Sequence, residues 1–212
     1  MCSLAIVYTY YEAPKNYNRA IQLYEKILES NPDNVKAQVG KGLIYVERGE
    51  LEEARTILGA VVKKYPTNIE AESEYYWCLV KLGEYSQGRK GLEGFLSKIT
   101  GGDLHSRETR AVARWRIAKS YFLENADDND NVKECYNNLI KSLKDSDLYA
   151  PSYTLLGILF QDYYGDTERA QKCFYKAFDL DTNEIVAARY LVQQATLKNE
   201  WEVAQVLAKR VV

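Results

Sequence analysis

The residue types that most often perform chemistry are scarce in this sequence. There is one histidine, His105, and no motif around it supplies a nucleophile together with an orienting group. Four cysteines occupy positions 2, 78, 135 and 173, and none belongs to a CxxC pair. Because a zinc site needs closely spaced ligands, we interpret the cysteines as three small buried residues and one terminal thiol in a reduced, intracellular chain. We therefore expect no catalytic residue, no metal ion and no cofactor.

A cluster of arginines is the strongest charge pattern in the chain. Arg107, Arg110 and Arg114 stand three and four residues apart, which would place them on one stripe of a helix, and Arg116 follows Trp115. Arginine beside an aromatic ring can bind single-stranded RNA by charge and stacking, or bind an acidic partner. The alternative is a solvated face or a salt-bridged contact with a neighbouring protein. The net charge of −2 favours this alternative and argues against direct contact with RNA.

An internal repeat provides the elements that must position these residues. Pro32 and Pro66 stand 34 residues apart, and Ala20 and Ala54 share this spacing. This is the period of the tetratricopeptide repeat (TPR), whose unit is a helix-turn-helix. Proline after the second helix ends it, because the ring removes a backbone donor. The pattern predicts an all-α TPR α-solenoid: a right-handed superhelix of antiparallel helix pairs with about six repeats, the last incomplete.

The register of the repeats follows from small residues at their eighth and twentieth positions, where helices A and B approach closely. Gly42 and Gly157 occupy eighth positions, whereas repeat three carries Tyr76 there and Gly88 at its twentieth. We expect Gly157 to lie where helix A meets helix B in repeat five. The predicted repeats form a single array, and they span 1–34, 35–68, 69–102, 111–149, 150–184 and, in part, 185–212, with an insert at 103–110.

Departures from the period predict loops and ends. The extra length between repeats three and four contains the breaker sequence Thr100–Asp103. The acidic segment 124–131 is nearly free of apolar residues, so we expect an exposed loop at 124–131. Terminal repeats normally carry a polar face. This chain instead begins with the apolar run Leu4–Val7 and ends with Val211–Val212. We therefore expect a slice of a longer solenoid.

The concave surface of a TPR array is lined by helix A positions two, five, nine and twelve. Tryptophan is enriched in binding hot spots, so we expect Trp77 and Trp115 to be partly exposed in this chain and buried by a partner. The alternative is packing within the superhelix or against the rest of the same chain. The predicted groove residues are Val39, Leu43, Val46, Trp77, Trp115, Lys119, Phe122 and Ile158, with Lys36, Arg189 and Gln193 interspersed.

Chaperone-binding TPR domains use a clamp of Lys, Asn and Arg for a C-terminal carboxylate, and that clamp is absent. The matching positions here hold Ala5, Thr9, Gly40, Glu70 and Glu74. Their residue types argue against a chaperone-type carboxylate site.

Three strings are more specific than the repeat pattern: Leu4–Lys15, Tyr149–Gly157 and Arg169–Asp181. Together with the extra residues after repeat three and inside repeat four, they resemble the TPR scaffold subunit of the superkiller (Ski) complex in its fungal form. The resemblance covers essentially the whole chain, although a family member is far longer.

The resemblance implies a cytoplasmic, non-catalytic scaffold. Such a scaffold holds a DExH-type RNA helicase and WD40 subunits, and assists the exosome in 3′-to-5′ decay of mRNA. The alternative is a generic peptide-binding TPR adaptor of the co-chaperone or cell-cycle type, and the missing clamp weighs against the co-chaperone version. No apolar run approaches the length of a membrane span, so we expect no membrane partner.

Overall fold

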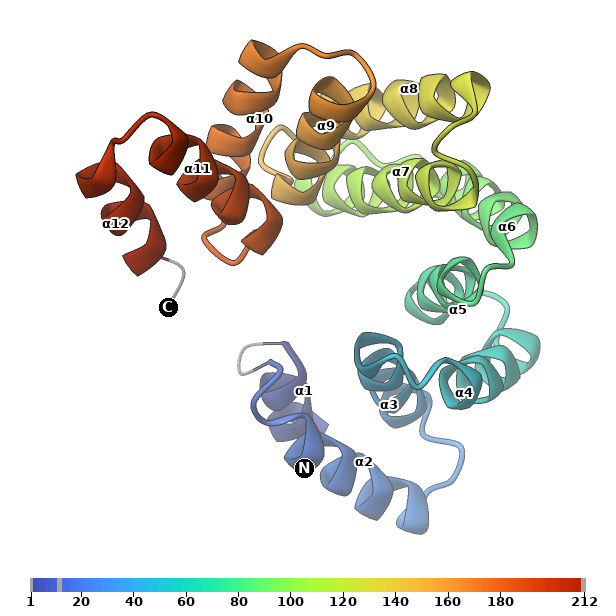
Figure 1. The fold of residues 1–212 in the computed structure, drawn as a ribbon. Coiled ribbons are helices and arrows are strands. Elements are labelled where there is room, and N and C mark those ends of the chain that lie inside the picture. The colour runs from blue at the N-terminus through green and yellow to red at the C-terminus, as the bar shows by residue number, and fades with distance from the viewer. Residues whose placement is uncertain (1, 11–12, 211–212) are drawn as a thin grey trace. The chain divides into compact units, whose positions relative to one another are not determined.

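The computed structural model describes residues 2–10 and 13–210, and every regular element in these ranges is an α-helix (Figure 1). Tyr11, Glu12 and Val211–Val212, which entered the sequence argument, lie outside them. No helix of the described ranges is both long and apolar enough to cross a bilayer. The helices are α1 Cys2–Tyr10, α2 Tyr17–Ser30, α3 Val35–Arg48, α4 Leu51–Lys64, α5 Ile69–Lys81, α6 Tyr85–Lys98, α7 Leu104–Glu124, α8 Asn129–Asp145, α9 Ala150–Asp162, α10 Thr167–Leu180, α11 Ile185–Leu197 and α12 Trp201–Lys209.

The chain divides into two compact units, residues 1–97 and 98–212. In the first unit, α1 packs on α2 and α3 on α4, and α3 also contacts α1 and α5. In the second, α7 packs on α8, α9 on α10 and α11 on α12, while α9 contacts both α7 and α11. Each unit is thus a stack of helix pairs in which helices A touch helices A of neighbouring repeats. The predicted all-α TPR fold is confirmed.

Local sequence accounts for where several helices begin and end. Asn34 and Asn68 stand one period apart and cap α3 and α5: their side chains accept hydrogen bonds from backbone N–H groups three residues on, at 3.0 and 2.8 Å. Gly49 and Gly83 follow helices A at the same spacing. Both adopt positive φ, 77° and 87°, which glycine accepts without a steric penalty. Cap and turn residues therefore repeat with the helices.

Small residues hold the helix pairs together as the register predicts. A Cβ added to Gly157 on α9 would lie 2.8 Å from the Phe174 ring on α10, which confirms the predicted A–B contact in repeat five. In repeat three, the large and small partners are exchanged between the helices. Tyr76 stands on helix A, and its ring covers Gly91 on helix B, where a Cβ would overlap it. The large residue at the eighth position, Tyr76, is thus accommodated by a glycine on the paired helix, Gly91.

Replacing Gly157 by leucine should destabilise the second unit by about 1–3 kcal/mol or more, because the new side chain overpacks against Phe174. Chemical denaturation gives the change in the free energy of unfolding. Gly94→Leu is a matched control, since a Cβ at Gly94 in α6 meets nothing within 4 Å. The control should keep or raise stability, by up to about 1 kcal/mol, because leucine favours helix more than glycine does. Equal stability of Gly157→Leu and the wild type would show that the helix contact is misplaced.

The insert is mostly helical, and the predicted acidic loop is shorter than expected. Residues 104–110 of the expected insert form the first turns of α7, and Asp103 caps that helix by accepting from Ser106 N at 3.0 Å. Of the acidic segment 124–131, only 125–128 is a turn, and α8 begins at Asn129. Acidic and amide side chains suit a helix N-terminus, where they accept from unpaired N–H groups. The extra residues therefore make α7 and α8 longer than the helices of a standard 34-residue repeat.

Candidate partner-binding surface

A cleft crosses the helix A face of the second unit. Helices α7 and α11 provide its walls and α9 lies between them, because α9 contacts both. The cleft encloses about 260 Å³. We call it the α9 cleft; it is lined by Trp115 and Lys119 of α7, by Pro151, Thr154, Leu155 and Ile158 of α9, and by Glu184 and Val186 at the start of α11. It unites Trp115, Lys119 and Ile158 of the predicted groove.

Trp115 is anchored at one end of the cleft. Its indole Nε1–H donates to the carbonyl oxygen of Pro151 at 3.1 Å, and the Tyr149 ring meets it edge-on with 6.0 Å between centroids. These contacts satisfy the polar atom within the chain and fix the ring. The side chain is half-buried, as expected, so part of an oriented aromatic surface remains accessible.

The cleft carries one cation and one carboxylate on opposite walls. The half-buried Lys119 ammonium lies 4.8 Å from the centroid of the Phe122 ring, and desolvation lowers the pKa of Lys119. No described carboxylate forms an ion pair with it. On the other wall, Glu184 accepts a hydrogen bond from the Thr154 hydroxyl at 2.6 Å. Burial raises the pKa of Glu184, and the Thr154 hydrogen bond opposes that rise.

The groove residues of the first unit are placed differently from the prediction. Val39, Val46 and Trp77 are buried, and only 6% of Trp77 is exposed, so the expectation of a partly exposed Trp77 is wrong. The Lys81 ammonium lies 5.7 Å from the Trp77 ring centroid and donates to the backbone oxygen of Val46 at 3.1 Å. Because α3 and α5 pack together, these side chains belong to the stack. Leu43 remains half-buried.

The arginine cluster binds its own chain. Arg110 Nε and Arg114 Nε lie 2.9 and 2.6 Å from the two carboxylate oxygens of Asp145, at the end of α8. Arg107 Nε donates to the backbone oxygen of Asp145 at 3.0 Å. The predicted patch for RNA or an acidic partner is thus corrected to an internal clasp between α7 and α8. Arg116 is half-buried on the same helix.

Sequence reasoning missed Asp145 and part of the α9 cleft. An acidic residue in the last turn of a helix is disfavoured by the helix dipole, so Asp145 signals a cationic partner. Thr154 and Val186 stand at helix A positions five and two, and the rule that found Trp115 could have found them. Glu184 precedes its helix, and no pattern points to it. Phe122 lies beside the cleft and packs edge-on against Tyr163.

The remaining reactive residue types are not assembled into a site. His105 is exposed in the first turn of α7. Cys78 and Cys135 are buried, and burial raises the pKa of their thiols to about 11 and about 12, which disfavours the nucleophilic thiolate. Cys173 and Cys2 are half-buried, so two of the three cysteines expected in the core are there. Within the described residues, no three His, Cys, Asp or Glu side chains could together hold a metal ion.

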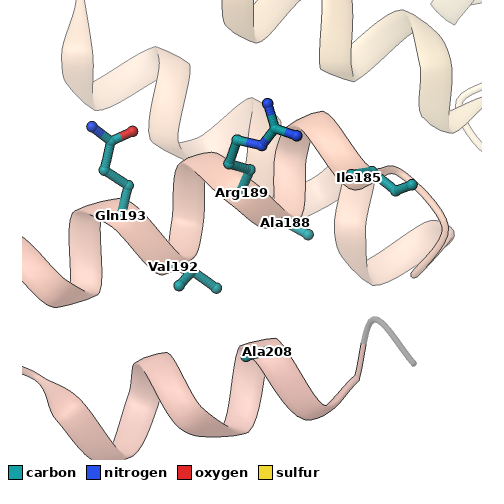
Figure 2. Close-up of a pocket in the computed structure, with 6 residues that line it drawn as sticks. All are labelled: Ile185, Ala188, Arg189, Val192, Gln193 and Ala208. Carbon is teal, nitrogen blue, oxygen red and sulfur yellow. The ribbon is translucent and has the colours of Figure 1, made fainter.

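A second cleft, of about 470 Å³, lies between α11 and α12. Figure 2 shows Val192 and Ala208 facing the gap between the helices, while Arg189 and Gln193 extend from α11 away from α12. The lining is almost wholly apolar, and it consists of Ile185, Ala188, Arg189, Val192, Gln193 and Ala208. The predicted Arg189 and Gln193 therefore border this cleft and not the α9 cleft.

Comparison with known proteins places this geometry in a family. A tetratricopeptide repeat model matches residues 13–73. Superkiller protein 3 of Saccharomyces cerevisiae is 39% identical over 99% of the chain, and that of Schizosaccharomyces pombe is 32% identical over 98%. The chain is a tetratricopeptide repeat protein related to superkiller protein 3. The resemblance to the fungal Ski TPR subunit is confirmed.

The match covers a small part of each relative. The chain spans 15% of the length of both yeast proteins. Human superkiller complex protein 3 is 23% identical over 87% of the chain, which spans 11% of that protein. The superkiller 3 relationship therefore concerns 11–15% of the length of each relative.

Solved structures agree on the fold. MamA from Desulfovibrio magneticus RS-1 has a TM-score of 0.58 and 15% identity, with coverage of 86% of this chain and 96% of MamA. YrrB, described as a TPR protein with an unusual peptide-binding site, has a TM-score of 0.53 and 18% identity, with 89% of each chain covered. At these identities the likeness supports the TPR fold alone.

Proposed function

We propose that this chain is a segment of a non-catalytic TPR scaffold in a Ski-type complex. The scaffold holds a DExH RNA helicase and WD40 subunits, and assists cytoplasmic, exosome-mediated 3′-to-5′ decay of mRNA. The observation that carries the proposal is the 39% identity to superkiller protein 3 over 99% of the chain. Partners bind through protein surfaces, and the chain itself does not contact RNA.

The placement of side chains supports a binding role over a chemical one. Burial raises the pKa of the Cys78 and Cys135 thiols, and Arg110 and Arg114 of the arginine cluster are paired with Asp145. The α9 cleft, in contrast, combines an oriented tryptophan with apolar and charged groups, which is typical of protein-recognition sites.

Affinity purification of the full-length parent protein tests the proposal. Helicase and WD40 subunits should be recovered with the parent protein, identified by mass spectrometry. Recovery of chaperones or cell-cycle proteins without those subunits would contradict the scaffold assignment and favour the generic adaptor.

Within the parent protein, Trp115→Glu should weaken partner binding by about 2 kcal/mol or more, since it removes an aromatic anchor from the α9 cleft. Loss of the hydrogen bond to Pro151 should cost about 1 kcal/mol of stability, and loss of the contact with Tyr149 about 0.5–1.5 kcal/mol more, so the repeats remain folded with reduced stability. Binding assays with purified subunits, run beside denaturation curves, separate the two effects. Lys141→Glu, at an exposed position of α8, is the control. Undiminished binding by a folded Trp115→Glu variant would move the contact away from this cleft.

A further inference from the structure

We propose that the α9 cleft binds a partner segment in which an aspartate or glutamate side chain neighbours a bulky apolar side chain. The acidic group pairs with Lys119, and the apolar group lies over Leu155, Ile158 and Val186. This inference rests on the proposed scaffold function and specifies the chemistry of a partner that the scaffold recognises.

The position of Lys119 requires an anion. Its ammonium is partly removed from water, lies against the Phe122 ring, and has no carboxylate partner among the described residues. A ring face stabilises a cation by far less than a carboxylate does in a desolvated site. A partner carboxylate entering the cleft would form a charge-assisted hydrogen bond with Lys119. Binding of an acidic group therefore compensates the desolvation that the fold imposes on this lysine.

The floor of the cleft requires an apolar side chain next to that acid. Leu155 and Ile158 of α9 line it, and Val186 at the start of α11 keeps 51% of its surface exposed. Trp115 closes the α7 end with a ring that its hydrogen bond to Pro151 holds in place. Leu155 is already only 2% exposed, so the surfaces that a bulky side chain would bury are those of Ile158 and Val186. A rigid aromatic wall loses little conformational entropy on binding.

Glu184 limits which ligands fit. Its carboxylate stands on the wall opposite Lys119 and is fixed by Thr154, so an acidic group is attracted to α7 and repelled from α11. The phosphates of an RNA strand would meet this carboxylate within the same cleft. A C-terminal carboxylate is also disfavoured, because Lys119 is the one cation of the cleft and the several donors of a TPR clamp are absent. A single acidic side chain matches a single ammonium.

A synthetic peptide library with each position varied in turn tests the proposal directly. The purified 212-residue chain should select peptides with Asp or Glu beside Leu, Ile or Phe. Lys119→Met keeps the length of the side chain and removes the charge, and it should lower affinity for the selected peptide at least tenfold. Lys141→Met, at an exposed position of α8, should bind as the wild type does.

A double-mutant cycle locates the ion pair. Glu→Gln in the selected peptide should lower affinity for the wild type as much as Lys119→Met does, and should have no further effect on the Lys119→Met variant. Thermal denaturation confirms that each variant is folded. Selection of peptides without an acidic residue, additive losses in the cycle, or a Lys119-dependent preference for oligouridine over the peptides would overturn the proposal.

The library contains no sequence from the Ski subunits, so the two proposals can fail separately. Acid-selective, Lys119-dependent binding supports the cleft chemistry even where purification of the parent recovers neither helicase nor WD40 subunits. Conversely, recovery of both subunits with a library that yields no Lys119-dependent peptide supports the scaffold and overturns the cleft proposal.

Discussion

Trp77→Glu should unfold the first unit. The tryptophan is 6% exposed on α5, and the substitution both removes a large buried ring and places a carboxylate in a buried position beside the Lys81 ammonium. Deleting a buried aromatic side chain costs about 3–5 kcal/mol, and desolvation of the new carboxylate, which Lys81 offsets in part, adds to this loss. We therefore expect a loss of at least about 4 kcal/mol, comparable to the whole stability of a small domain. Hydrogen exchange in α3–α5 should show complete loss of protection.

Trp201→Glu is the matched control for this experiment. Trp201 lies at the start of α12 and is 63% exposed, so its replacement should change stability by no more than about 0.5 kcal/mol. Trp77→Phe tests the same site without a charge and should retain folded protein with reduced stability. If the Trp77→Glu variant is folded but no longer binds the partner, Trp77 belongs to the partner-binding groove, as the sequence predicted.

Asp145→Ala should destabilise the second unit by about 2–3 kcal/mol. The carboxylate of Asp145 is bound by Arg110 and Arg114. The Asp145 side chain is 16% exposed, that of Arg110 is 17% exposed, and that of Arg114 is 27% exposed. Removing one member of a buried ion pair costs about 3–5 kcal/mol because the remaining charge keeps its desolvation penalty; partial exposure reduces that figure here. Denaturation curves at low and high salt give both the size of the loss and its weak dependence on screening.

Glu168→Ala provides the comparison with an exposed ion pair. Glu168 pairs with Lys172 on α10, and their side chains are 80% and 73% exposed. Such pairs contribute about 0.5 kcal/mol or less. If Asp145→Ala costs no more than this control, Arg110 and Arg114 are solvated in solution and become available to a partner again.

The helices and their limits could be predicted from sequence because their causes are local. Asn34 and Asn68 cap helices through hydrogen bonds that span three residues, and Gly49 and Gly83 end them through their own backbone angles. Gly157 could be placed against helix B because the repeat assigns it to the face where two helices meet. The period could not show whether extra residues lengthen a loop or a helix, so it placed residues 104–110 outside repeat four, whereas they begin its helix A.

The candidate site was only partly predictable, because the residue types on one face of a helix do not show which other helix packs against that face. Trp77 and Trp115 occupy two of the concave-face positions of helix A, the ninth and the fifth of their repeats, yet one is buried in the stack and the other half-exposed in the α9 cleft. Asp145 lies 31 residues after Arg114 in sequence, and only the packing of α8 on α7 brings the two side chains together. Sequence by itself determined the repeat and the fold, which depend on short-range backbone geometry and periodic burial, and the resemblance of three specific strings indicated the family. Tertiary structure decided which charges pair and which aromatic rings face a partner, because burial and electrostatic contact depend on residues from separate helices.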